Sequence, residues 1–209
     1  MRFETKPESV FFIGITGGSC AGKTEFAKRL RTALGFEYCN ILNQDAYYLD
    51  QSASFKGDGS VNFDAPESID FELLYQHLLR LQRNEPIQVP IYDFGSHKRF
   101  SKTKTLFSAN IILLEGELIF TQPKIRDLLT ECVFIDIPEP TRLSRRPKRD
   151  MQERGRQREG VILQFEHHVR PMHRRYIEPV KQLATYIVNN DFTAGEVIAD
   201  IVNKLGIDS

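Results

Sequence analysis

A glycine-rich segment near the start of the chain constrains its fold more than any other feature. Residues 17–24 read GGSCAGKT and fit the phosphate-binding pattern G-x-x-x-x-G-K-[ST]. An apolar run over 10–15 precedes this segment, and a run that can be helical, 25–31, follows it. Glycines let the backbone curl so that successive N–H groups point at phosphate oxygens, and the positive helix N-terminus adds to the attraction. We therefore expect a nucleoside triphosphate to bind at residues Gly17, Gly18, Ser19, Cys20, Ala21, Gly22, Lys23 and Thr24.

Oxygen-bearing side chains near this segment indicate where a metal ion would bind. Lys23 is expected to reach the β- and γ-phosphates, and the Thr24 hydroxyl can coordinate Mg²⁺. The clearest buried strand after the first covers residues 110–114 and ends in Glu115. A carboxylate at that point is typical of the Mg²⁺ side of a protein with a phosphate-binding loop. Thr24 and Glu115 are thus the expected metal-side groups.

Asp45 follows the second predicted strand, which we expect over residues 36–42. In a parallel sheet, a carboxylate directly after a strand projects over the carboxyl edge, where ligands bind. Asp45 can therefore take the proton of an attacking hydroxyl group. On spacing alone, an aspartate that caps a helix or forms a turn explains this position equally well.

Strands and helices alternate along the chain, which predicts an α/β fold. This is a three-layer arrangement with a parallel sheet, right-handed crossovers and helices on both faces. Without repeats or a low-complexity linker, residues 1–209 are expected to form one domain. One helix is expected to begin at a Ser68 cap and to bury an apolar stripe from Phe71 to Leu79. The expected strands are 10–16, 36–42, 110–114, 132–137 and 186–188, with an extended piece at 87–92, and further helices cover 23–34, 125–129 and 194–205.

Composition and charge exclude several classes of protein. Lys+Arg and Asp+Glu balance at 28 each, so the overall charge favours neither a nucleic-acid partner nor a membrane surface. The chain has no apolar run of about 18 residues, and its first eight residues carry no apolar signal core. Three cysteines, Cys20, Cys39 and Cys132, match neither a disulfide framework nor a zinc spacing. We therefore expect a cytoplasmic protein.

The densest charge lies between residues 140 and 160, where arginines outnumber acidic side chains. Such a run is usually a solvated helix face. A nucleic-acid surface is a second interpretation, but the run lacks interleaved aromatic residues. A cationic lid that closes on phosphates is the interpretation that the phosphate loop supports best, because arginine binds phosphate oxygens bidentately and closure excludes water. Pro147 lies inside this segment and is expected to kink or end a helix there.

Taken together, the motifs resemble those of the uridine kinase (uridine–cytidine kinase) family. The matching segments are GGSCAGKT, NQDAYY, VNFDAP, VPIYDFGSHKR, LLEGELIF, FIDIPEPTRLSRRPKRDMQERGR and QFEHHVRPMHRRYIEPVKQLA. They follow the order of the family and cover residues from about 10 to 187. A chain of this length looks like the kinase domain alone, and the resemblance implies ATP as the phosphate donor, with GTP as a possible substitute, and often a tetramer.

The resemblance implies roles for the acceptor side. Asp45 matches the base that takes the proton from the ribose 5′-hydroxyl. Asp64, with Arg146 as its partner, matches the carboxylate that holds the ribose hydroxyls. Tyr92 and His97 match the pair that reads the O4/N4 edge of a pyrimidine. The other acceptor-side matches are the apolar walls Phe63 and Phe94, the base contact Arg156 and the nucleoside contact Gln164.

On the donor side, the resemblance assigns Arg149 and Arg154 to the ATP phosphates. Together with Asp45 and Lys23, Arg149 is expected to act directly in catalysis. The chain departs from the family at Ala65, at Asn189-Asn190 and at Pro147, where His, Pro-Arg-Gly and a proline-free lid are usual. None of these changes removes a group that we assign to the chemistry.

The expected activity is ATP-dependent phosphorylation of uridine or cytidine at the 5′-hydroxyl. One alternative is a related kinase that acts on another alcohol, such as phosphoribulose, pantothenate or nicotinamide riboside; Tyr92 and His97 favour a pyrimidine over these. A second alternative is a nucleotide-dependent switch without transfer activity, which would not need Asp64, Tyr92 and His97. A nucleic-acid binder ranks last.

Overall fold

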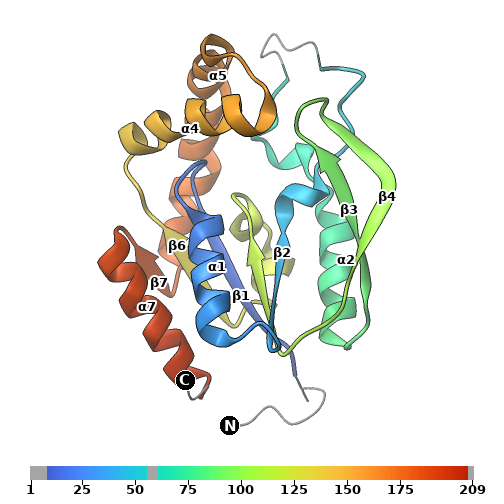
Figure 1. Ribbon diagram of the computed structural model, residues 1–209, viewed down its shortest axis with the longest axis vertical. Coiled ribbons are helices and arrows are strands. Elements are labelled where there is room, and N and C mark those ends of the chain that lie inside the picture. Colours follow the sequence, from blue (N-terminus) through green and yellow to red (C-terminus); the bar gives the residue numbers. More distant parts are fainter. Residues whose placement is uncertain (1–8, 56–60, 207–209) are drawn as a thin grey trace.

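Five parallel strands form the central sheet, in the order β2-β5-β1-β6-β7 (Figure 1). The computed structural model describes residues 9–55 and 61–206, so the N-terminal segment that we expected to lack a signal lies outside the described residues. The predicted parallel sheet is confirmed. Its strands are β1 (Phe11–Gly17), β2 (Cys39–Asn43), β5 (Ile111–Glu115), β6 (Glu131–Ile135) and β7 (Tyr186–Val188).

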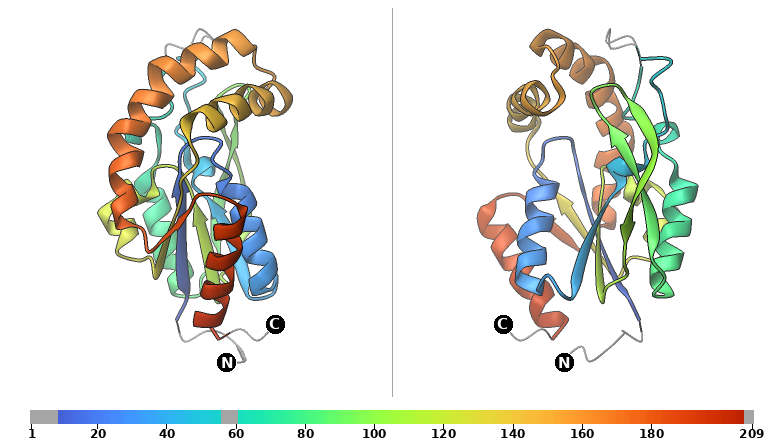
Figure 2. Two further views of the ribbon diagram at one scale, coloured as in Figure 1. Left: turned by 90° about the vertical axis from the view of Figure 1, so that its left-hand side faces the viewer. Right: turned by 45° about the vertical axis from the view of Figure 1, so that its right-hand side comes forward.

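Alternating side chains of the strands feed two hydrophobic cores, one on each face of the sheet. Phe12, Ile112 and Leu114 pack with α2 and α3 on one face. Ile13 and Leu113 pack with α1 and α7 on the other face (Figure 2). This period-two alternation in fully buried strands produces the predicted three layers. The helices are α1 (Lys23–Leu34), α2 (Phe71–Gln82), α3 (Pro123–Arg126), α4 (Glu139–Arg154), α5 (Arg158–Gln164), α6 (Arg170–Met172) and α7 (Asp191–Lys204).

The carboxyl ends of the parallel strands place the site. In the sheet register, Ile15 of β1 and Asn43 of β2 both pair with Glu115 of β5. The segments that follow these three strands therefore emerge at the same edge. From α5 onward, α6 and two π-helical turns continue the helical path, which arches over that edge and returns to the body of the molecule (Figure 2). In the part of the chain that the structure describes, every helix is too short or too polar to cross a bilayer.

A two-stranded antiparallel hairpin lies outside the central sheet. It consists of β3 (Ile87–Asp93) and β4 (Lys98–Leu106). The extended piece predicted at 87–92 is confirmed, whereas β4 was not predicted. Most of the β4 side chains are exposed, so this strand has no alternating apolar face that the sequence would reveal.

Several predicted element starts are wrong. β2 begins at Cys39, three residues later than expected, α7 begins at Asp191, three residues earlier than expected, and α3 begins at Pro123, two residues earlier. The second long helix begins after Asp70, whose side chain accepts a hydrogen bond from Leu73 N at 3.0 Å. Ser68 lies in a short 3₁₀ turn instead, and its hydroxyl donates to Asn62 O at 2.8 Å. Aspartate and serine are both good caps, and the tertiary contact of Ser68 decides between them.

Helix α4 does not end at Pro147 but continues to a left-handed cap at Gly155, φ 61°. A proline inside a helix removes one backbone hydrogen bond and costs about 3 kcal/mol. Arg146 and Asp150 bracket the proline and form an ion pair one turn apart, Nε to Oδ2 3.7 Å. Asp150 also forms ion pairs with Arg149, Arg154 and Arg156, so side-chain contacts as well as the helix backbone hold the turn after the proline.

Candidate active site

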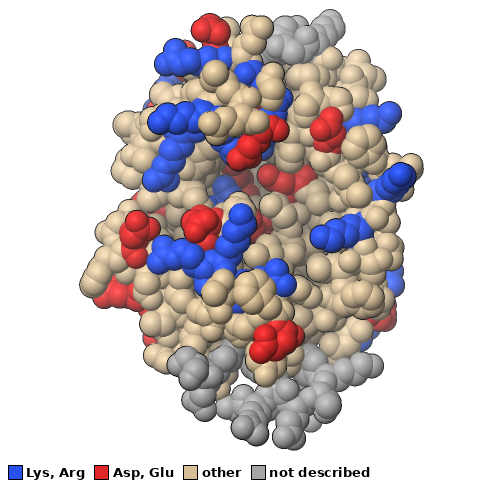
Figure 3. Space-filling model, in the orientation of Figure 1, with Lys and Arg blue, Asp and Glu red and all other residues tan. Residues whose placement is uncertain are grey.

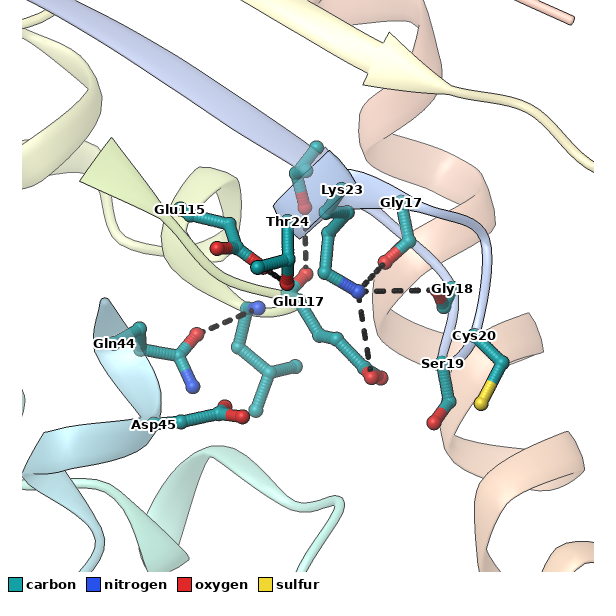
Figure 4. A network of polar contacts seen from close by, with 12 residues as sticks. Gly17, Gly18, Ser19, Cys20, Lys23, Thr24, Gln44, Asp45, Glu115 and Glu117 are labelled. Atoms are coloured by element: carbon teal, nitrogen blue, oxygen red, sulfur yellow. Dashed lines mark hydrogen bonds and ion pairs between the residues drawn. The ribbon is translucent and has the colours of Figure 1, made fainter. Parts of the chain in front are cut away.

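The phosphate loop joins β1 to α1 in a conformation that needs its glycines. Gly17 and Gly22 have φ values of 143° and 101°, and Cys20 has φ 60°. A Cβ atom on Gly17 would lie 2.4 Å from the carbonyl oxygen of Ile135, so no larger residue fits there. The Lys23 ammonium donates to Gly17 O at 2.9 Å and to Gly18 O at 3.0 Å (Figure 4).

The expected metal-side groups meet at the start of α1. Thr24 Oγ1 donates to Glu115 Oε1 at 2.6 Å (Figure 4). Asn43 Nδ2 lies 3.5 Å from Glu115 Oε2. Burial raises the pKa of Glu115, and the Thr24 hydrogen bond opposes that shift. Among the described residues, no cluster of three or more His, Cys, Asp or Glu side chains gathers as a metal site. A hydroxyl and one carboxylate suit Mg²⁺, which keeps several water ligands and binds jointly to substrate phosphates.

Asp45 lies on a 3₁₀ turn, Gln44–Tyr47, that follows β2. The cap of this turn is Asn43, whose Oδ1 accepts a hydrogen bond from Asp45 N at 2.8 Å. The interpretation of Asp45 as the capping residue is therefore wrong, and its carboxylate is directed toward the phosphate loop (Figure 4). Burial raises the pKa of Asp45, and the positive charge of Arg154 opposes this shift.

A cleft lies beside Asp45, between the sheet edge and helices α4 and α5. Figure 3 shows Lys and Arg side chains around the hollow below α4 and acidic side chains within it. All nine residues that the resemblance assigns to the acceptor side, Asp45 included, line this cleft. Its lining consists of Ser19, Asp45, Tyr48, Phe63, Asp64, Tyr92, Phe94, His97, Glu117, Arg146, Arg149, Arg154, Arg156 and Gln164.

Three residues that line this cleft have a buried polar atom without a hydrogen-bond partner within the described residues. One is Arg146, whose Nε lies 3.7 Å from Asp150 Oδ2. The other two atoms are Asp64 Oδ2 and His97 Nε2. The other ring nitrogen of His97, Nδ1, is hydrogen-bonded to the Tyr92 hydroxyl at 3.1 Å. Phe63 stacks on the His97 ring with the centroids 3.8 Å apart. Because an unpaired buried polar group is costly, the Asp64 and His97 atoms are suited to receive a ligand.

The pKa of His97 is lowered to about 4, mainly by burial and then by the positive charge of Arg156. The imidazole is therefore neutral at physiological pH. A neutral ring presents one donor and one acceptor, and the tautomer is set by the partner of the other nitrogen. His97 also has a positive φ of 53°, an uncommon conformation for a residue other than glycine.

The arginine-rich segment docks on the phosphate loop. Arg146 Nη1 donates to Ser19 Oγ at 2.7 Å, and its Nη2 donates to Gln164 Oε1 at 3.1 Å. Arg146 was expected to partner Asp64, but its hydrogen bonds go to Ser19 and Gln164. Its positive charge still favours the ionised form of Asp64, whose pKa is raised by burial. Arg154 lies 4.1 Å above the ring centroid of Phe94.

Glu117 is a site residue that the sequence reasoning missed. Its carboxylate lies 3.5 Å from the Lys23 ammonium, and its backbone oxygen accepts a hydrogen bond from Thr16 Oγ1 at 2.8 Å (Figure 4). Burial would raise the pKa of Glu117, but Lys23 and the lid arginines lower it below its ordinary value. Its position two residues after Glu115, just past the end of β5, was the available signal.

A second cleft continues along the phosphate loop and is lined by Cys20, Lys23, Thr24 and Glu115 among others. Asp45, Glu117 and Arg149 line both this cleft and the first. These three side chains thus stand at the boundary between the two spaces. The arrangement suits transfer of a phosphoryl group from a nucleotide in one cleft to an acceptor in the other. The fold and site define a kinase of the phosphate-binding-loop class.

Comparison with known proteins gives the family. Residues 12–193 match the model of the "Phosphoribulokinase / Uridine kinase family". The chain is 43% identical over 181 residues to the uridine kinase of Shewanella frigidimarina and 42% identical to that of Vibrio cholerae, in each case covering 84% of this chain and 85% of the relative. The chain therefore belongs to the phosphoribulokinase/uridine kinase family.

Solved structures agree on the fold. A "possible uridine kinase" from Bacillus stearothermophilus superposes with a TM-score of 0.63 at 17% identity, covering 88% of this chain and 91% of that one. Phosphoribulokinase from Rhodobacter spheroides gives a TM-score of 0.62 at 15% identity, over 85% and 69% of the two chains.

Proposed function

We propose that the protein phosphorylates uridine and cytidine at the 5′-hydroxyl, with ATP as the donor. The observation that carries this proposal is the position of Asp45. It lies at the boundary between the phosphate-loop cleft and a cleft whose unpaired groups, Asp64 Oδ2 and His97 Nε2, suit a ribose and a base. The relatives named above are uridine kinases, which supports the same activity.

In the proposed reaction, Asp45 accepts the proton of the nucleoside 5′-hydroxyl group. The hydroxyl oxygen forms a bond to the γ-phosphorus of ATP, and the bond between the γ-phosphorus and the oxygen of the β-phosphate breaks. ADP leaves. Loop N–H groups, Lys23 and Arg149 hold the phosphates and offset the charge of the transferring group. Thr24 and Glu115 would hold Mg²⁺, which would supply positive charge to offset that of the phosphates.

The Tyr92–His97 pair explains how one site can accept both bases. When Tyr92 donates to Nδ1, Nε2 of the neutral ring carries the hydrogen and can donate to O4 of uracil. When Nδ1 carries the hydrogen and donates to the Tyr92 oxygen, Nε2 can accept from the N4 amino group of cytosine. Asp64 would accept hydrogen bonds from the ribose hydroxyls, Phe63 and Phe94 would flank the base, and Arg156 and Gln164 would complete the contacts.

We also propose a domain organisation, a partner and a location for the protein. Residues 1–209 act as one kinase domain, with residues 140–160 as the lid that brings Arg149 and Arg154 to the phosphates. The partner is a nucleoside, not a nucleic acid or a membrane, and we place the protein in the cytoplasm as a homo-oligomer, with a tetramer as the form suggested by the resemblance.

An assay of ADP release over a panel of nucleosides and other alcohols, with ATP and Mg²⁺, tests the activity. We expect uridine and cytidine to stimulate ADP release far above the basal rate. Release stimulated instead by a phosphorylated sugar or by pantothenate would identify a different kinase. Slow release that no acceptor stimulates would indicate a nucleotide-dependent switch.

Asp45→Asn tests the assigned base. The variant should still bind ATP and uridine but lose about 10²- to 10⁴-fold in kcat. Asp127→Asn, an exposed change of the same kind after α3, is the matched control. Full turnover by the Asp45→Asn enzyme would remove Asp45 from the mechanism.

A further inference from the structure

Asp150 is fully buried and is surrounded by four arginines of the lid. The carboxylate of this α4 residue forms an ion pair with each of them, and Arg149 also donates from Nε to Oδ1 at 2.9 Å. The four nitrogen–oxygen distances are 2.8 Å to Arg149, 3.3 Å to Arg156, 3.7 Å to Arg146 and 3.8 Å to Arg154.

One negative charge is shared among four positive ones. Burial alone would raise the pKa of Asp150, but Arg146 and Arg149 hold it below its ordinary value, so the carboxylate is ionised. The arginines also repel one another: the pKa of Arg156 is lowered mainly by burial, Asp150 opposes this shift, and the charges of Arg146 and Arg154 add to it. The cluster therefore has an excess of positive charge, and Asp150 is the group that its four arginines have in common.

The four arginines reach both halves of the proposed site. Arg149 lines both clefts, and the proposed function assigns it to the donor phosphates together with Arg154, which lines the acceptor-side cleft and lies over Phe94. Arg146 and Arg156 both donate to Gln164 Oε1 on the acceptor side, at 3.1 and 2.5 Å, and Arg146 also donates to Ser19 of the phosphate loop. A single carboxylate thus connects the groups that would bind ATP with those that would bind the nucleoside.

We propose that Asp150 is a positioning residue that couples ATP binding to nucleoside binding. The inference rests on the proposed function. When Arg149 and Arg154 form ion pairs with the ATP phosphates, Asp150 keeps ion pairs with two arginines instead of four. Arg146 and Arg156 are then held more firmly, with less repulsion from their neighbours, and the acceptor side is organised before the nucleoside arrives. By linkage, bound nucleoside must strengthen ATP binding by the same factor.

Calorimetric titration of the full chain with uridine, with and without Mg²⁺ and β,γ-methylene-ATP, measures this coupling. We expect the analogue to tighten uridine binding roughly 5- to 150-fold in the wild-type protein. In Asp150→Asn the factor should fall close to one, because the amide has the same shape but no charge. Glu159→Gln, an exposed change of the same charge in α5, should keep the wild-type factor.

A wild-type factor of one, or an unchanged factor in folded Asp150→Asn, would overturn the inference. If uridine is phosphorylated but the coupling does not depend on Asp150, only this inference fails; if no nucleoside binds, the proposed function fails with it. If the Asp150→Asn variant does not fold, an NMR measurement on the wild-type protein tests the inference instead. The Nε–H NMR signals of Arg146 and Arg156 should shift on adding the Mg²⁺–analogue complex without uridine, and the absence of a shift would contradict the redistribution.

Discussion

Replacing Glu117 by glutamine should tighten the binding of ATP in the absence of Mg²⁺. The Glu117 carboxylate lies 3.5 Å from the Lys23 ammonium, the group that is expected to contact the phosphates. Glu117 neutralises that charge and also repels the incoming phosphates. The substitution Glu117→Gln removes both effects and keeps the shape of the side chain.

The size of the effect follows from the distance and the exposure. Two unit charges at this separation attract by about 5 kcal/mol at an effective dielectric constant of about 20, and by about 1 kcal/mol in bulk water. The Glu117 side chain is 26% exposed and the Lys23 side chain 9%, so solvent screens the pair in part. A value of about 1.5 kcal/mol corresponds to a roughly tenfold lower Kd for ATP.

Calorimetric titration with ATP in the presence of EDTA is the assay, since it excludes any contribution of a metal ion. Glu37→Gln is the control, because Glu37 is exposed and precedes β2, at the opposite edge of the sheet from the phosphate loop. Unchanged or weaker ATP binding by Glu117→Gln would refute the reasoning. It would mean that the Lys23 position depends on its bonds to Gly17 and Gly18, whose carbonyl oxygens it also contacts.

Three further predictions concern groups around the same loop. Because burial raises the pKa of Asp45 and the base must be ionised, kcat should fall as the pH is lowered, with a midpoint above the ordinary pKa of aspartate. The folded state also loses stability as the pH rises through the raised pKa of Asp45. The substitution Asp45→Asn should therefore not lower Tm at pH 7. N-ethylmaleimide should modify Cys20 alone in the folded protein, because Cys39 and Cys132 are buried thiols whose pKa values are raised to about 12 and about 11. Because Cys20 lines the phosphate-loop cleft, ATP should slow its modification in a mass-spectrometric time course. Gly17→Ala should cost about 1–3 kcal/mol and lower Tm, because Gly17 has φ 143° and its Cβ would lie 2.4 Å from the carbonyl oxygen of Ile135, whereas Gly195→Ala in α7 meets no atom within 4 Å and should not lower Tm; equal Tm values would contradict the close packing on the loop.

The parts of the fold that the sequence predicted are those with a strong local pattern. The strand before the phosphate loop, helix α1 and the run ending in Glu115 each combine buried apolar residues with a motif, and their positions agree with the structure to within one or two residues. Strand β4 has no such pattern, because it pairs only with β3 among the described residues and leaves most of its side chains in solvent. Helix α4 continues through Pro147, and the ion pair that spans the proline, Arg146–Asp150, lies in the folded lid, where the sequence alone does not reveal it.

The candidate site shows the same division. Residues in recognisable motifs, such as Asp64 and His97, were named from the sequence, and the structure brings them to one cleft. Glu117 was not predicted, because its importance depends on the 3.5 Å distance between its carboxylate and the ammonium of Lys23, which lies 94 positions earlier in the chain. In the sequence, Asp150 is one of several acidic residues in the charged segment 140–160. Its role depends on complete burial, which local sequence does not reveal.

The position of Asp45 depends on the core as much as on the site. Two residues later in the same turn, Tyr47 is fully buried, and its hydroxyl is hydrogen-bonded to Nδ1 of His77 in α2 at 2.8 Å. Before the turn, Asn43 is held in register with Glu115. The same turn also packs against β3 of the hairpin. The base is therefore fixed relative to the phosphate loop by sheet register, by α2 and by the hairpin that carries Tyr92, so a substitution that distorts the hairpin is expected to disturb phosphoryl transfer as well as acceptor preference.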